Sequence, residues 1–243
     1  MANAQIAVFT HATVAEASDR AVAAMAAAVQ TQVHRDFAAS WHIDADLTFL
    51  PAGQRVPPGL WQVGVFDNSD QAGALGYHDV TRDGLPLGKV FARSTIMDGG
   101  QVSVTLSHEA LEMLADPDIN LTASVESPSG GGRLYAYETC DAVEADDIGY
   151  DIDGVVVSDF VFPEWFVASL RGHDVQFDQQ RKVSEPFELA PGGYIPVTDV
   201  WPPDWQQIQA RGEPAKDPLQ RPRVGSRRER RRTGRSRWQR SAS

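Results

Sequence analysis

The apolar positions of the N-terminal half alternate between strand spacing and helix spacing. Short runs rich in β-branched and aromatic residues, bounded by prolines, glycines and acids, indicate strands. From Thr13 to about Trp41 alanines and valines recur at helical spacing, and Thr13 followed by Glu16 is a capping pattern. The expected strands are residues 5–10, 45–50, 60–67, 74–81 and 85–96, the last two joined by a turn at residues 82–84.

A second helix is expected within the stretch GGQVSVTLSHEALEMLA, residues 99–115, beginning at Ser103 or Thr105. Pro117 ends it, because the residue before a proline is driven out of the α region. A glycine-rich loop and extended pieces follow, among them residues 150–162, and the rest is irregular. This order of strand, helix, several strands, one helix and an irregular C-terminal part predicts an α+β fold.

Charge is distributed unevenly along the 243 residues. From Arg221 onward the chain carries ten arginines and one acid, Glu229, which leaves 12 basic and 32 acidic residues before it. We therefore predict one domain over residues 1–205 and a Pro-containing linker with an Arg-rich, disordered tail over residues 206–243. Such a tail can contact nucleic acid or the acidic body by counterion release. A non-functional extension, such as frame-shifted coding sequence, would also be rich in arginine, serine and glycine, and we favour this interpretation of the tail.

Cysteine content and hydropathy restrict the compartment. Cys140 is the only cysteine, so the chain has no internal disulfide and no CxxC zinc or redox site. The N-terminus lacks the basic and apolar segments of a secretory signal. The most apolar run, residues 21–29, is shorter than the roughly 20 residues that span a bilayer. We expect a cytoplasmic or virion-associated protein without a signal peptide or a membrane partner.

The second helix carries the most informative chemistry. His108 and Glu112 are four residues apart, so on a helix their side chains point the same way and can bind one ion. Glu109 projects beside that ion, where a base that activates a metal-bound water must lie. This is the arrangement of the HExxH metalloproteases with glutamate in place of the second histidine, and a carboxylate oxygen is a competent zinc ligand.

A catalytic zinc requires a third protein ligand and an open position. On a continued helix Asp116 would lie about 12 Å from His108 along the axis, too far to share an ion. Pro117 lets the chain fold back, which makes both Asp116 and Asp118 candidates. Asp118 follows His108 by ten residues, the metzincin spacing, although Ala115 stands where that class has its turn glycine. An acidic helix face that is merely solvated remains the alternative.

A later acidic segment, ETCDAVEADD at residues 138–147, supplies further carboxylates. Glu138 and Asp141 are candidates for a remaining ligand, or for a carboxylate that does not bind the metal but orients the imidazole of His108. A solvated acidic loop is the alternative of equal weight. In the strand candidate ALGYHDVT, His78 would lie near the metal if this strand is the sheet edge beside the helix; otherwise it is an ordinary polar strand residue.

The segments SHEALEMLADP and YETCDAVEADDIGYDIDGVVVSDFVFPEWF resemble a family of uncharacterised bacterial and prophage proteins with an SHExxExxxDP motif and a later ExCD segment. That family is generally regarded as zincin-like metallopeptidases, and the similarity covers roughly residues 60–166. It implies a mixed sheet with an N-terminal backing helix, an active-site helix and an edge strand that holds an extended peptide. The positions that match its motifs are His108, Glu109, Glu112, Asp116, Glu138 and Asp141.

Two functions follow from these patterns. The first is a zinc-dependent peptide-bond hydrolase of the zincin-like type, acting on a peptide or protein substrate, with Glu109 taking a proton from the bound water. The second is a non-catalytic zincin-like structural or interaction protein of phage or prophage origin. Calcium is the alternative ion, because most candidate ligands are oxygens.

Overall fold

The computed structural model describes residues 3–71, 73–126, 131–202 and 204–210, and every structural statement below concerns these residues. The predicted Arg-rich tail lies outside them. Strand β11 (Gln206–Gln209) pairs with β10 (Tyr194–Asp199), so residues 206–209, assigned to the linker from the sequence, form a strand of the second sheet.

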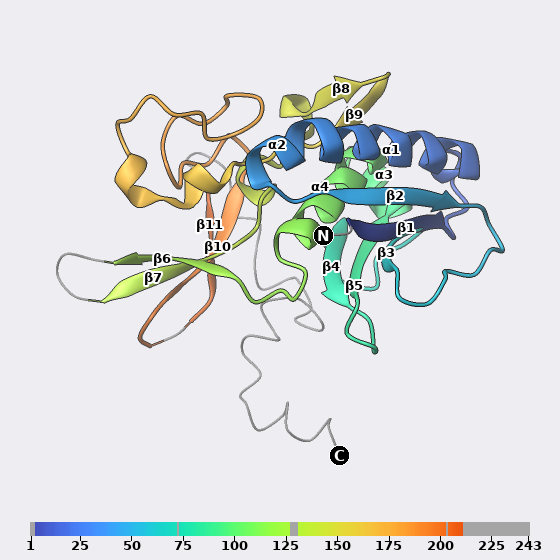
Figure 1. Cartoon of the computed structure of the whole chain (residues 1–243), viewed down its shortest axis with the longest axis horizontal. Coiled ribbons are helices and arrows are strands. Elements are labelled where there is room, and N and C mark those ends of the chain that lie inside the picture. Colours follow the sequence, from blue (N-terminus) through green and yellow to red (C-terminus); the bar gives the residue numbers. More distant parts are fainter. Residues whose placement is uncertain (1–2, 72, 127–130, 203, 211–243) are drawn as a thin grey trace, which may run out of the picture.

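The main sheet has five strands in the order β2-β1-β3-β5-β4 (Figure 1). Strands β2, β1, β3 and β5 run parallel to one another, whereas β4 is antiparallel to β5 and forms one edge. The five strands are β1 (Ala4–Thr10), β2 (Ala45–Leu50), β3 (Trp61–Phe66), β4 (Gly76–Val80) and β5 (Pro86–Phe91). The predicted short apolar runs therefore become one mixed sheet.

Two long helices cover one face of this sheet. Helix α1 (Asp19–Gln32) contacts β1 and β2, and α4 (Val102–Ala115) contacts β3, β4 and β5. Because the helices also contact each other, they lie side by side on the same face (Figure 1). Of the 14 residues of α4 only Thr105 and His108 are not fully buried. Helix α4 is thus the central element of the molecule.

The helix boundaries differ from the sequence prediction at three places. The first helix begins at Asp19, because the Thr13 backbone N–H and hydroxyl bond to Asp67 at 2.8 and 2.7 Å instead of capping a helix. It continues through a π-helical turn (Val33–Phe37) into α2 (Ala38–Trp41). The strand expected over 85–96 ends at Phe91 and is followed by α3 (Ala92–Met97). Helix α4 starts at Val102 and ends before Asp116 and Pro117.

A second, four-stranded antiparallel sheet follows α4 in the order β11-β10-β7-β6. Its hairpin, β6 (Thr122–Glu126) and β7 (Gly132–Ala136), lies apart from the main sheet in Figure 1. Aromatic rings join the two parts, since Tyr137 packs on Trp41 of α2 at 5.3 Å between centroids and on Phe166 at 4.3 Å. The connecting elements are β8 (Tyr150–Ile152), β9 (Val155–Val157) and short 3-10 turns at Ala15–Ala17, Asp141–Val143, Asp146–Ile148, Pro163–Phe166 and Ala168–Leu170.

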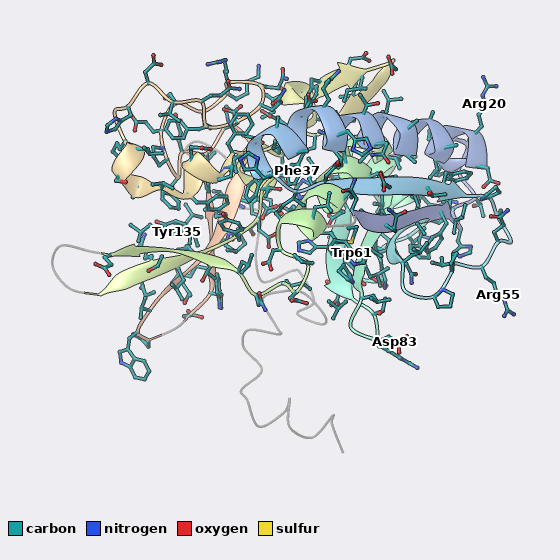
Figure 2. All side chains as sticks on the ribbon, in the orientation of Figure 1. Arg20, Phe37, Arg55, Trp61, Asp83 and Tyr135 are labelled. Atoms are coloured by element: carbon teal, nitrogen blue, oxygen red, sulfur yellow. The ribbon has the colours of Figure 1, made fainter. Side chains whose placement is uncertain are left out.

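The buried apolar residues form one core that runs from β1 to β10. Phe37, which is fully buried, stacks on Trp41 and contacts Phe160, while Arg20 and Arg55 project from the surface (Figure 2). The fold is α+β with a mixed sheet, as the sequence predicts. No helix in the described part of the chain has the length and apolar character that crossing a bilayer requires.

Candidate metal centre

Helix α4 presents three acid or imidazole side chains toward strand β4 and the turn at Asp141–Val143. His108 and Glu112 are one helical turn apart, and His108 Nε2 lies 3.4 Å from Glu112 Oε2. A hydrogen bond ties the helix to the segment after β9: the Ser107 hydroxyl accepts the Ser158 backbone N–H at 2.6 Å. The apolar residues around these positions bury α4 against the sheet, so the polar side chains are held at defined positions.

The first candidate group consists of His108, Glu112 and Asp141. His108 Nε2 lies 3.3 Å from Asp141 Oδ1, and one donor atom from each residue lies within 4.8 Å of the others. Zinc binds nitrogen and carboxylate oxygen at about 2.0–2.2 Å, so two donors of a tetrahedral ion are about 3.3–3.5 Å apart. The two separations from His108 fit one zinc ion. His108 keeps 12% of its side chain exposed, so it is the most accessible of the three residues.

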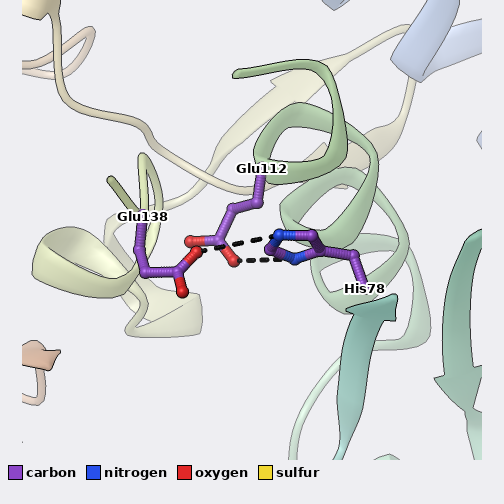
Figure 3. Close-up of side chains that lie close together, drawn as sticks. All are labelled: His78, Glu112 and Glu138. Carbon is purple, nitrogen blue, oxygen red and sulfur yellow. Dashed lines mark ion pairs between the residues drawn. The ribbon is translucent and has the colours of Figure 1, made fainter. Parts of the chain in front are cut away.

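The second candidate group consists of His78, Glu112 and Glu138 (Figure 3). His78 Nδ1 lies 3.6 Å from Glu112 Oε2, and its Nε2 lies 4.0 Å from Glu138 Oε2. His78 comes from the edge strand β4, whereas Glu138 precedes the turn that carries Asp141. Glu112 therefore belongs to both groups, and its other oxygen, Oε1, accepts the Cys140 backbone N–H at 3.2 Å.

Glu109 lies beside the two groups, under the edge strand. Its Oε2 is 3.7 Å from His78 Nδ1, is buried and accepts no hydrogen bond from the described residues. A Cβ added at Gly76 would lie only 2.5 Å from Glu109 Oε1, which shows how closely β4 covers this carboxylate. The side chain thus points between the sheet edge and the imidazole of His78.

Four carboxylates and two imidazoles share this interior region. Glu109, Glu112, Glu138 and Asp141 are each between 3% and 5% exposed. Burial raises the pKa of Asp141 to about 7 and the pKa of Glu109 well above its ordinary range, and the charge of Glu112 raises both further. Burial lowers the pKa of His108, but Glu112 and Asp141 outweigh it and raise that pKa well above its ordinary value. Buried like charges are costly unless a cation compensates them.

The donor atoms fit a divalent cation. Imidazole nitrogen with carboxylate oxygen is a zinc ligand set, and the separations around His108 match its bond lengths. Glu109 Oε2, which is buried and accepts no hydrogen bond from the described residues, is a polar atom that a bound cation could satisfy. Calcium fits less well, because it takes six to eight oxygen ligands and two imidazoles stand here.

Two of the residues singled out in the sequence lie apart from both groups. The Asp116 carboxylate accepts the backbone N–H groups of Asn120 and Leu121 at 2.9 and 3.0 Å, and so closes the loop that follows α4. Asp118 is exposed, and neither aspartate belongs to a potential metal-binding group among the described residues. The chain does turn after Asp116, where the Ile119 backbone N–H bonds to the Asp116 carbonyl oxygen at 3.0 Å. The turn places the Asp116 carboxylate against backbone N–H groups.

The structure brings together His108, Glu109, Glu112, Glu138 and Asp141, together with His78. Spacing alone could only suggest His78, because its approach depends on which strand lies at the sheet edge beside α4. Burial raises the pKa of the Cys140 thiol far above its ordinary value, so a nucleophilic thiolate is disfavoured there.

In three comparisons with known proteins, no protein-family model, no curated protein and no solved structure matched this chain.

Proposed function

We propose that this chain is a metal-dependent peptide-bond hydrolase of the zincin-like type, with zinc as its ion. The observation that carries the proposal is the convergence of His108 Nε2, Glu112 Oε2 and Asp141 Oδ1 at zinc-ligand separations. The Glu109 carboxylate comes from the same helix as His108 and Glu112 and lies 3.7 Å from His78 Nδ1. In this proposal Asp141, which the sequence offers as an alternative ligand, is the third ligand in place of Asp116 or Asp118.

The arrangement of elements gives further support. Zincin-like domains place an active-site helix and a backing helix on a mixed sheet whose edge strand borders the site. The packing of α4 and α1 on a mixed sheet with β4 at its edge is compatible with that arrangement and supports the proposal. An exposed strand edge can bind an extended peptide by strand addition. The SHExxExxxDP and ExCD segments, which resemble the zincin-like family, supply the residues that converge.

A bound zinc ion would polarise the scissile carbonyl and lower the pKa of water. His108, Glu112 and Asp141 would hold it, and Cys140 would orient Glu112 through its backbone N–H. Glu109 would accept the proton of the attacking water at Oε2, the oxygen that accepts no hydrogen bond from the described residues, and return it to the leaving amine. His78, 3.7 Å from that oxygen, would position it.

The test compares Glu109→Gln with the wild type after both are loaded with Zn²⁺. We expect the wild type to cleave casein or a peptide library, and the variant to hold zinc but lose at least about 100-fold in rate, the usual contribution of general base catalysis. Glu16→Gln, at an exposed position of the first 3-10 turn, is the matched control and should keep full activity. Equal rates in wild type and Glu109→Gln would eliminate the proton-transfer role.

A non-catalytic role is the second candidate, and one observation favours it. Apart from His108, the candidate ligands are nearly inaccessible, and a closed coordination shell is typical of structural metal sites. Zinc retained by a wild-type protein that cleaves no peptide would support this role.

A further inference from the structure

We propose that the centre holds two divalent ions that share Glu112, the second bound by His78 and Glu138. This inference deepens the proposed function and rests on the first ion at His108, Glu112 and Asp141. It concerns a binding site and can be tested without a substrate.

Glu112 Oε2 lies between the two imidazoles. It is 3.4 Å from His108 Nε2 on one side and 3.6 Å from His78 Nδ1 on the other. Among the described residues, no group of donor atoms within 4.8 Å contains both histidines. Two ligands of one zinc ion are never more than about 4.4 Å apart, since each bond is about 2.0–2.2 Å. One ion therefore cannot bind both imidazoles, and two positions flank Glu112.

Bridging by one carboxylate suits this spacing. Two-metal hydrolytic sites hold their ions about 3.5–4 Å apart, and an oxygen about 2.1 Å from each ion can bridge them. Each position has its own imidazole and its own second carboxylate, Asp141 on one side and Glu138 on the other. Figure 3 shows Glu112 and Glu138 both directed toward the ring of His78.

The charge of the region also favours two ions. Four buried carboxylates, Glu109, Glu112, Glu138 and Asp141, carry four negative charges when ionised. One divalent ion beside two neutral imidazoles would leave two of these charges in the interior, where an uncompensated charge is strongly disfavoured. Two divalent ions balance all four.

Glu109 provides an independent indication of the second position. Its Oε2 is buried, accepts no hydrogen bond from the described residues and lies 3.7 Å from His78 Nδ1, on the His78 side of the centre. A buried carboxylate oxygen in this state requires an explanation, and a bound ion is one of the usual ones. An ion bound to His78 Nδ1, the nitrogen that also faces Glu112 Oε2 at 3.6 Å, would give this oxygen a cation to face.

The experiment counts bound zinc. Full-length protein is stripped with chelator and titrated with Zn²⁺, and bound metal is measured by mass spectrometry after dialysis. We expect two ions per wild-type chain and one per chain in His78→Ala and in Glu138→Gln. His173→Ala, which removes an exposed imidazole far along the chain, should keep two. Glu138→Gln keeps the side-chain shape, so it serves if His78→Ala does not fold by circular dichroism.

A spectroscopic readout shows whether the two ions are neighbours. With Mn²⁺ in place of zinc, two ions on one bridging oxygen give an exchange-coupled electron paramagnetic resonance spectrum, and His78→Ala should give the signal of an isolated ion. An uncoupled spectrum in the wild type would overturn the shared centre, as would one zinc per wild-type chain that His78→Ala retains.

These results separate the two proposals. One zinc per chain with hydrolysis that needs Glu109 would overturn the second ion and leave the proposed function standing. Two coupled ions without hydrolysis would support the second ion and overturn the proposed function.

Discussion

A methyl group added at Gly76 should test the position of the general base without touching a metal ligand. Gly76 begins the edge strand β4, and its backbone passes directly over Glu109. The φ angle of Gly76 is not positive, so its backbone lies outside the left-handed region. Alanine is therefore tolerated by the backbone, and the only obstacle is the carboxylate.

The structure gives the size of this perturbation. The new Cβ would lie 2.5 Å from Glu109 Oε1, 2.8 Å from its Cγ and 2.9 Å from its Cδ. Non-bonded heavy atoms prefer separations of about 3.5 Å or more, so the carboxylate must move by about 1 Å. A displacement of that size at a catalytic group can reduce the rate about 100-fold. We expect Gly76→Ala to lose that factor in kcat/KM.

The assay measures peptide hydrolysis, zinc content and the unfolding midpoint of Gly76→Ala beside Gly88→Ala. Gly88 lies on β5, directly opposite His78 of β4, and a Cβ there would be 3.3 Å from Val63 and 3.6 Å from the Cβ of Glu109. This control should keep activity within a few-fold and the same zinc content. Wild-type kcat/KM in Gly76→Ala would refute the placement of Glu109 under the strand.

Three further predictions use stability and metal content. In chelator, the free energy of unfolding of Glu112→Gln should be about 1–2 kcal/mol higher than that of the wild type, because one of four buried carboxylates is neutralised. In zinc it should be lower than that of the wild type, which gains about 2.7 kcal/mol at a zinc concentration of 100 times Kd. A lower free energy of unfolding in both conditions would contradict this. Burial and Asp178 raise the pKa of Asp159 to about 9. The folded protein therefore keeps a proton that the unfolded chain releases near the ordinary value of 3.8, so the contribution to stability is complete below that pH and is lost as pH rises toward 9, by up to about 1.4 kcal/mol per unit. Asp159→Asn should flatten the dependence of the urea-unfolding free energy on pH between about pH 6 and 9. Parallel profiles in the variant and the wild type would contradict the raised pKa of Asp159. Asp116→Ala should lower the free energy of unfolding by about 1–3 kcal/mol and leave the zinc content unchanged. Asp118→Ala, at an exposed position, should change neither the stability nor the zinc content. Loss of zinc in Asp116→Ala would show that Asp116 is a ligand after all.

Local signals in the sequence predict the elements that carry the site. Residues 99–115 have helical periodicity and end at a proline, and α4 follows them within a few residues. His108, Glu109 and Glu112 share a helix, so their relative positions follow from helix geometry alone. The short apolar runs likewise become β1, β2 and β3, because short segments rich in apolar and β-branched residues favour burial in a sheet.

The contacts that complete the site depend on long-range packing, which spacing cannot specify. His78 reaches Glu112 only because β4 turns back antiparallel to β5 and becomes the edge over α4. Asp116 has the offset and the proline bend of a ligand, yet its oxygens bond to backbone N–H groups that appear only once the loop is folded. The hairpin strand β6 was missed because its sequence, TASVE, is short and mostly exposed.

The most direct test of the metal centre is the position of zinc in a crystal of the zinc-loaded protein. A difference map recorded at the zinc absorption edge should show a peak about 2.0–2.2 Å from His108 Nε2, Glu112 Oε2 and Asp141 Oδ1. A map at saturating zinc with no peak at these three atoms, or with zinc bound only to surface carboxylates, would contradict the account.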